Sequence, residues 1–114
     1  MARTRAVLQA PKTVTAAETQ LNQDAIPVGS NRTGVVFCDL YAFTTPFVVV
    51  IQTCSDVNSQ SGGTGNWITL GTMTFTGAGS QKLAITDLGD AIRWNVTSSG
   101  SGNTFALKVF FCDV

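Results

Sequence analysis

Histidine is absent from this chain of 114 residues, and only 12% of the residues are charged. Without histidine, the chain lacks the side chain that most often moves protons near neutral pH, which excludes Ser-His and Cys-His nucleophile systems. Seven basic residues balance seven acidic ones, so no net charge attracts the chain to nucleic acid or to an anionic membrane. We therefore expect a protein that is not an enzyme and that binds neither of those partners.

Cysteine is also scarce. Cys38, Cys54 and Cys112 are odd in number, and each lies within or beside an apolar run. A secreted disulfide scaffold would have an even and denser set of cysteines, so we interpret these three as buried thiols. Because no two of them are close in sequence and histidine is missing, we expect no metal site and no cofactor.

The first residues, MARTRAVLQA, contain no apolar run of about seven to fifteen residues, the length that a signal peptide requires. They predict synthesis in a cytoplasm. Arg3, Arg5 and Lys12 occur here without an acidic residue, so we interpret residues 1–12 as a basic N-terminal arm that docks on an acidic neighbouring surface. Residues 13–114 are then expected to form one domain, which is long enough to fold alone.

Patterns typical of helices are nearly absent. Only residues 15–24 could hold a turn of helix, and irregular or extended structure is preferred there. Apolar runs separated by polar loops instead indicate strands at 34–43, 47–54, 66–75, 81–86, 91–97 and 104–111. This spacing predicts an all-β fold, an antiparallel β-sandwich of about seven to eight strands, jelly-roll-like or Ig-like. The short link at 44–46 predicts that the first two of these strands are neighbours.

Two local patterns give sharper predictions. In the run 66–75, the apolar phase slips by one residue across Gly71, which predicts a β-bulge at that glycine. Trp94 shares the phase of Ile92 and Val96 and is therefore assigned to the core. Trp67 follows a long Gly-Ser loop where the phase is ambiguous, so it is the better candidate for a surface contact.

Paired carboxylates would be the remaining route to catalysis. Asp87 and Asp90 lie in TDLGDA, a setting typical of turns, and no surrounding motif indicates a glycosidase pair. Asp39 interrupts an apolar strand. We interpret it as a solvent-facing strand position or a partner of Arg32 or Arg93, with a polar contact in a subunit interface as the alternative.

Apolar residues occupy both sides of several strands. Phe37, Tyr41 and Phe43 alternate with apolar residues of the opposite phase, and Phe110 opposes the inward set of its own strand. A domain of this size cannot easily cover both sets, so we expect some of them to contact another subunit. The candidate subunit contacts are Arg3, Arg5, Lys12, Phe37, Tyr41, Phe43, Trp67 and Phe110.

The order of these elements resembles that of small β-sandwich structural proteins that tailed bacteriophages encode near their capsid genes. In that pattern, an I-Q-T-S-x-D strand precedes a W-x-x-L-G-x-x-x-F run, a G-S-Q turn, an I-R-W element and a closing strand. The corresponding segments are 51–56, 67–75, 79–81, 88–94 and 104–111. Cys54 stands where serine is more usual, and the resemblance covers about residues 6–112.

The resemblance implies a virion structural protein, similar in kind to the head decoration, or cement, proteins that clamp neighbouring capsid subunits. The implied partners are the major capsid protein and further copies of this chain, with a trimer favoured by the symmetry of expanded capsids. The implied location is the capsid surface, after synthesis in the host cytoplasm. Proteins of the head-tail junction or tail remain alternatives. A carbohydrate-binding adhesion module is a further one, which would require Trp67, Tyr41 or Arg93 to cluster in a shallow groove with Asn or Asp.

Overall fold

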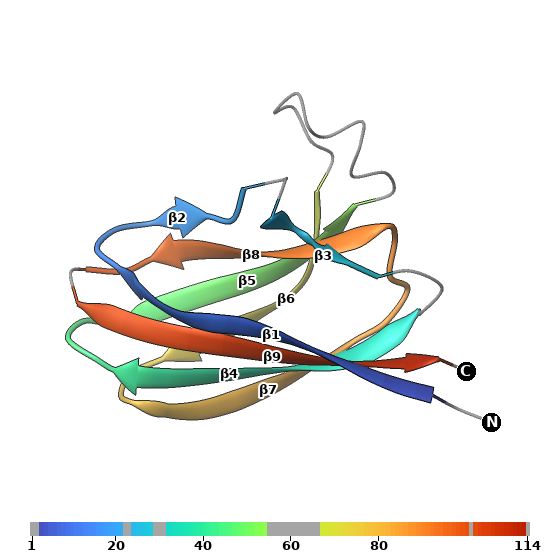
Figure 1. Cartoon of the computed structure of the whole chain (residues 1–114). Helices are drawn as coiled ribbons and strands as arrows, with labels where there is room; N and C mark the ends of the chain where they lie inside the picture. Colours follow the sequence, from blue (N-terminus) through green and yellow to red (C-terminus); the bar gives the residue numbers. More distant parts are fainter. Residues whose placement is uncertain (1–2, 22–23, 29–31, 55–66, 101, 114) are drawn as a thin grey trace.

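The computed structural model describes residues 3–21, 24–28, 32–54, 67–100 and 102–113. These residues form two antiparallel sheets that pack face to face, and they contain no α-helix (Figure 1). The strands are β1 (Arg3–Val14), β2 (Glu18–Thr19), β3 (Ile26–Pro27), β4 (Thr33–Ala42), β5 (Phe47–Cys54), β6 (Ile68–Phe75), β7 (Gly79–Ile85), β8 (Ala91–Ser98) and β9 (Asn103–Asp113). The all-β sandwich predicted from the sequence is confirmed.

The strand order is β1-β9-β4-β7 in the four-stranded sheet and β2-β8-β5-β6 in the five-stranded sheet, where β3 also pairs with β8. The expectation that β4 and β5 are neighbours is wrong, because they belong to different sheets. Residues 43–46 carry the chain from one sheet to the other (Figure 1). A short link serves this crossing as well as a hairpin, since both strands direct an apolar side toward the same interior.

Residues 3–12, interpreted from the sequence as a basic arm, belong to β1. This strand pairs with β9 from Arg3 opposite Asp113 to Val14 opposite Asn103, so the boundary expected after Lys12 falls inside a strand. The register shifts between Gln9 and Lys12. Proline lacks the N–H group that a ladder requires and is tolerated at bulges and edges, which fits Pro11 at this shift.

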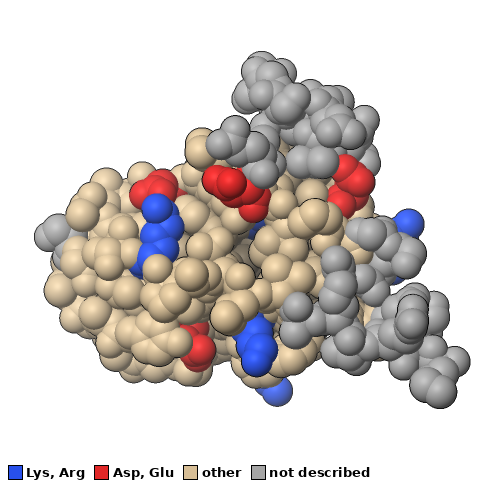
Figure 2. Space-filling model, viewed as in Figure 1, with Lys and Arg blue, Asp and Glu red and all other residues tan. Residues whose placement is uncertain are grey.

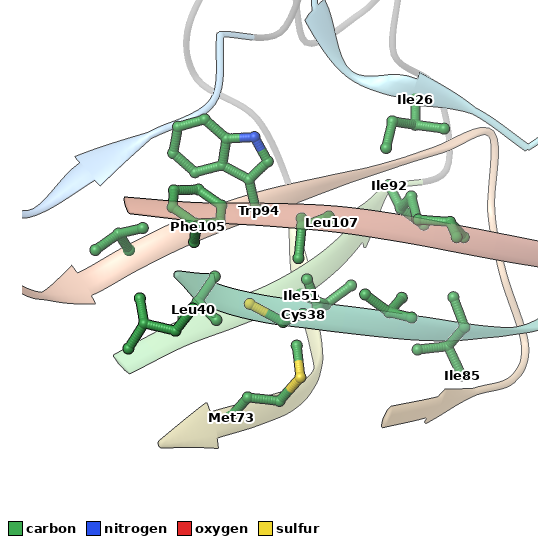
Figure 3. Close-up of a cluster of buried hydrophobic side chains, with 14 of the residues drawn as sticks. Ile26, Cys38, Leu40, Ile51, Met73, Ile85, Ile92, Trp94, Phe105 and Leu107 are labelled. Atoms are coloured by element: carbon green, nitrogen blue, oxygen red, sulfur yellow. The ribbon is translucent and has the colours of Figure 1, made fainter. Parts of the chain in front are cut away.

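The inward-facing side chains of the two sheets form one apolar core (Figure 3). Trp94 is 3% exposed and meets the ring of Phe105 edge-on, with the centroids 5.3 Å apart. The assignment of Trp94 to the core is therefore confirmed. The largest fully buried side chains are Phe47, Phe105, Phe111, Ile51, Met73, Ile85, Ile92 and Leu107.

A bulge was expected at Gly71, and the structure has one centred on the preceding residue. Ile51 of β5 lies opposite Gly71, whereas the next residue, Gln52, lies opposite Thr69, so Leu70 is the extra residue on β6. Beyond the bulge, Met73 points into the core. The inserted residue changes which side chains of β6 face inward, as the slip in the apolar pattern indicated.

Asn103 is a buried polar anchor that the sequence reasoning did not single out. Its side chain is fully buried; Oδ1 accepts a hydrogen bond from the Thr44 N–H at 2.9 Å, and Nδ2 donates to the Ser99 hydroxyl at 2.9 Å and to the Thr45 carbonyl at 3.2 Å. These bonds tie the β4–β5 connection to the β8–β9 connection. A buried amide with several partners fixes loop geometry, because leaving any of its groups unpaired is costly.

The cysteines are free thiols. Cys38 and Cys54 are buried, as expected, and Cys112 is half-buried near the end of β9. Burial raises the pKa of the Cys38 thiol to about 12, and the neighbouring charge of Asp39 acts in the same direction. This thiol therefore stays protonated and unreactive near neutral pH.

Candidate interaction surface

The outer face of the four-stranded sheet places apolar and basic side chains in adjacent rows. One row sets Val35 of β4 between Phe110 of β9 and Ala84 of β7. The next row sets Phe37 between Lys108 and Lys82. We call the outward side chains Leu8, Val35, Phe37, Lys82, Ala84, Lys108 and Phe110 the Phe37 face. Alternation along each strand produces it, since the intervening residues of β4 and β9 point into the core.

Aromatic packing organises the centre of the Phe37 face. The rings of Phe37 and Phe110 meet at 89° with their centroids 5.7 Å apart, and the Lys108 ammonium lies 5.1 Å from the Phe110 centroid. Both rings are only half-buried, and Leu8 on the adjoining strand is 70% exposed. Because each ring is held by its neighbours, the face offers rigid apolar area at little further cost in side-chain entropy.

A shallow hollow adjoins Phe110. The residues that line it are Thr33, Gly34, Val35, Ala84, Ile85, Thr86, Phe110, Phe111 and Cys112. A β-carbon at Gly34 would lie 2.6 Å from the Phe110 carbonyl oxygen, so this glycine permits the close approach of β4 to β9. The hollow extends the apolar area of the Phe37 face toward one end of the sheet.

Charged side chains are sparse on the Phe37 face, and Figure 2 shows that most of the described surface in this view is uncharged. Lys82 and Lys108 are exposed. Asp39 is half-buried and accepts a hydrogen bond from the Ser80 hydroxyl of the neighbouring strand. Of the two arginines expected as partners for Asp39, Arg93 belongs to β8 in the other sheet.

Two further candidates lie at the end of β4. Tyr41 is 61% exposed. Phe43 was expected on the same outward side, but it is half-buried and packs against the core. The reason is that β4 ends at Ala42 and the chain there turns toward the second sheet, so the alternation that places Phe37 outward does not extend to Phe43.

The basic candidates at the N-terminus belong to an edge strand. The backbones of Arg3 and Arg5 pair with Asp113 and Phe111 of β9. Lys12 forms an ion pair with Glu18, with its Nζ 2.9 Å from Oε2. Part of the charge attributed to a free arm is therefore balanced within this chain.

The outer face of the five-stranded sheet has a different character. The guanidinium of Arg93 stacks 4.4 Å from the centre of the Trp67 ring, and its Nε donates to Gln52 Oε1 at 2.8 Å. Burial lowers the pKa of Arg93 from its ordinary value, although the group stays charged at neutral pH. The structure thus brings Trp67 and Arg93 together, as the carbohydrate-binding alternative requires, but it places Tyr41 on the opposite sheet.

Neither a metal-binding cluster nor a membrane-spanning helix is found in the described part of the chain. No group of three or more His, Cys, Asp or Glu side chains comes together there. None of the described segments is a helix long and apolar enough to cross a membrane.

No protein-family model and no curated protein sequence matches this chain. Solved structures with the same fold include the SPBc2 prophage-derived protein YomS, with a TM-score of 0.61 at 11% identity, covering 99% of this chain and 96% of that one. The PBSX exported protein XepA has a TM-score of 0.62 at 11% identity and covers 94% of this chain but 36% of XepA.

A third similar structure comes from Bacillus endospore appendages, described as a family of disulfide-linked pili. Its TM-score is 0.57 at 13% identity, and the match covers 96% of this chain and 87% of that one. At these identities the likeness establishes a shared sandwich fold. The sandwich fold expected from the sequence is therefore shared with a protein that is described as prophage-derived.

Proposed function

We propose that this chain is a non-enzymatic structural protein of a tailed-phage particle, and specifically a head decoration protein that binds the assembled capsid. The Phe37 face is the observation that carries the proposal. It is an apolar, aromatic surface on a rigid sheet, and no described element of the chain covers it. Residues of this type are enriched at the centres of protein interfaces, where buried aromatic side chains supply most of the binding energy.

The charges around the Phe37 face indicate which partner surface it fits. Lys82 and Lys108 flank Phe37 across the neighbouring strands, whereas Asp39 is engaged by Ser80. A partner with an apolar centre and carboxylates at its rim would complement this arrangement. Such complementarity raises the association rate and excludes basic competitors.

The fold relatives support the phage assignment. A sandwich of the same fold is described as prophage-derived, and it matches over nearly the full length of both chains. The sequence contains no histidine, which agrees with a mechanical role. A protein that binds the assembled shell but not its free subunits stabilises the shell by mass action, because dissociation of the shell must first release the bound protein.

The proposed partners are the major capsid protein and neighbouring copies of this chain, assembled as a homo-oligomer, with a trimer as the form that suits a capsid local threefold axis. The same face would serve a protein of the head-tail junction or the tail. These positions differ in copy number, since decoration covers the whole shell whereas a junction or tail protein occupies one vertex.

The direct experiment is to add purified protein to expanded heads that lack decoration. We expect saturable binding at a fixed ratio to the major capsid protein and a higher temperature of head disruption. Free capsid subunits serve as the control, and they are expected to bind weakly. Binding at one vertex only would reassign the protein to the junction or tail, and no binding to any particle would refute the proposal.

A further inference from the structure

A second feature of the molecule is a hollow lined by residues of β1 and β2, the edge strands of the two sheets, together with the segment that follows β2 and Trp94 of β8. It lies away from the outer face of either sheet, and the inference drawn from it does not depend on the proposed function. The residues that line the hollow are Gln9, Lys12, Glu18, Thr19, Gln20, Leu21, Asp24 and Trp94.

The wall of the hollow is fixed by a buried glutamine. Gln20 is only 5% exposed; its Oε1 accepts a hydrogen bond from the Trp94 N–H at 3.1 Å, and its Nε2 donates to the Asp24 carbonyl at 2.8 Å. The Gln20 N–H donates in turn to the Trp94 carbonyl at 3.1 Å. These bonds join the segment after β2 to β8, so the polar groups of the hollow are held in place before any ligand arrives.

The floor of the hollow contains hydrogen bonds that are longer than usual. Gln9 Oε1 accepts from both the Trp94 indole Nε1 and the Gln20 Nε2, and each distance is 3.4 Å. Typical N–H···O distances in proteins are about 2.7–3.2 Å. Two buried donors therefore converge on one acceptor without optimal geometry. A ligand hydroxyl can accept a hydrogen bond from one of these N–H groups and donate one to Gln9 Oε1. Both protein groups would then form shorter hydrogen bonds.

The rim of the hollow carries charges of both signs. Lys12 Nζ lies 2.9 Å from Glu18 Oε2 and 6.0 Å from the centre of the Trp94 ring, and Asp24 is exposed. Figure 2 shows basic and acidic groups side by side on this part of the surface. The rim thus presents a strong donor together with strong acceptors, spaced around an aromatic ring.

We infer that this hollow binds one neutral sugar residue, through Gln9, Lys12, Glu18 and the Trp94 indole N–H. A sugar hydroxyl both donates and accepts, so it can use the paired donors and acceptors that the hollow presents. An anionic ligand would face the carboxylates of Glu18 and Asp24, and a cationic ligand would face Lys12. A neutral polyol avoids both costs, because no unpaired charge is buried when it binds.

The test is to measure the binding of glucose, galactose, mannose and N-acetylglucosamine to the full chain by saturation-transfer NMR and titration calorimetry. We expect saturable binding of at least one of these sugars with a millimolar dissociation constant. The Gln9→Ala variant should bind about tenfold more weakly, because it loses one or two ligand hydrogen bonds. Glu18→Gln should give a smaller loss, since the amide retains an acceptor oxygen.

Gln52→Ala is the matched control. Gln52 is also a half-buried strand glutamine, but it lies on the outer face of the other sheet, where it accepts from Arg93. The Gln52→Ala variant is expected to bind the sugar with the same affinity as the unchanged protein. The inference is overturned if none of the four sugars binds saturably, or if Gln52→Ala removes binding while Gln9→Ala retains it. Neither result bears on capsid binding, which is measured with heads and not with sugars.

Discussion

The outer faces of the two sheets are built on the same sandwich but are opposite in character. On the four-stranded sheet, Phe37 and Phe110 pack together without full cover, between exposed lysines. On the five-stranded sheet, the half-buried ring of Trp67 is covered on one side by the Arg93 guanidinium, which is itself hydrogen-bonded to Gln52. On the first face, the aromatic rings keep apolar surface that is exposed to solvent. On the second face, a side chain of the same chain covers part of the aromatic ring. This contrast between the described outer faces is the reason why we propose the first face, and not the second, as the surface for a protein partner.

The largest expected effect comes from removing the aromatic pair. The double variant Phe37→Ala with Phe110→Ala should bind expanded heads at least ~30-fold more weakly, because truncating a central interface aromatic costs about 2 kcal/mol or more. Sedimentation of heads with labelled protein measures this change. Trp67→Ala is the matched control, since it removes an aromatic ring from the opposite face. Equal loss of binding in both variants would remove the distinction between the two faces.

One glycine in each sheet allows the packing of the two sheets to be compared through the free energy of unfolding. At Gly34, an added β-carbon would lie 2.6 Å from a backbone oxygen, whereas at Gly71 it would lie 2.7 Å from the end of the Leu83 side chain. A side chain can move aside more easily than a paired strand. Gly34→Ala should therefore lower the free energy of unfolding by about 1–3 kcal/mol, and Gly71→Ala by less. Urea denaturation measures both, and the reverse order would contradict the close approach of β4 to β9.

The buried thiol of Cys38 makes the stability of the four-stranded sheet depend on pH. The folded-state pKa of Cys38 is raised from 9.0 to about 12. Its contribution to stability is therefore complete below pH 9 and is lost as the pH rises toward 12. We expect the free energy of unfolding to fall more steeply over this range in the unchanged protein than in Cys38→Ala, as measured by denaturation at each pH.

The cysteine thiols differ in their reactivity. At pH 8, a thiol reagent should label half-buried Cys112 before Cys38 and Cys54, which are buried. Mass spectrometry of peptides from the labelled protein identifies the order. Rapid labelling of Cys38 in the folded protein would show that the core opens more readily than its burial indicates.

The smallest effect is expected at the edge between the two sheets. Lys12 and Glu18 form an ion pair whose side chains are 36% and 44% exposed, and pairs of this kind contribute at most about 1 kcal/mol. Lys12→Met should therefore leave head binding unchanged and shift the unfolding midpoint only slightly. A large loss of head binding would instead support the basic N-terminal contact that the sequence predicted.

The later strands could be predicted from the sequence within one or two residues, because they alternate clearly between polar and apolar positions. The run 47–54 coincides with β5, and the run 91–97 with β8 apart from its last residue. The first strand, β1, was interpreted as an arm. Its alternation is interrupted by Pro11, and its pairing with β9 joins opposite ends of the chain, which local patterns do not reveal.

The candidate surface was predictable in part. Alternation along a strand correctly places Phe37 and Phe110 on the outward side, but their contact depends on the register between β4 and β9. The stacking of Arg93 on Trp67 likewise depends on the order of the sheet, because β5 lies between β8, which holds Arg93, and β6, which begins after Trp67. The hollow at Gln9 and Gln20 carries no recognisable sequence signal, because each glutamine alone is an ordinary polar residue.

The proposed function requires that the Phe37 face is the surface through which the protein binds the particle. The decisive measurement is a cryo-electron microscopy map of decorated heads, compared with a map of bare heads. We expect density for one sandwich per binding site, oriented with β4, β7 and β9 against the capsid subunits and with Trp67 directed away. Density in which the outer face of the five-stranded sheet meets the shell, or no added density at saturating protein, would contradict it.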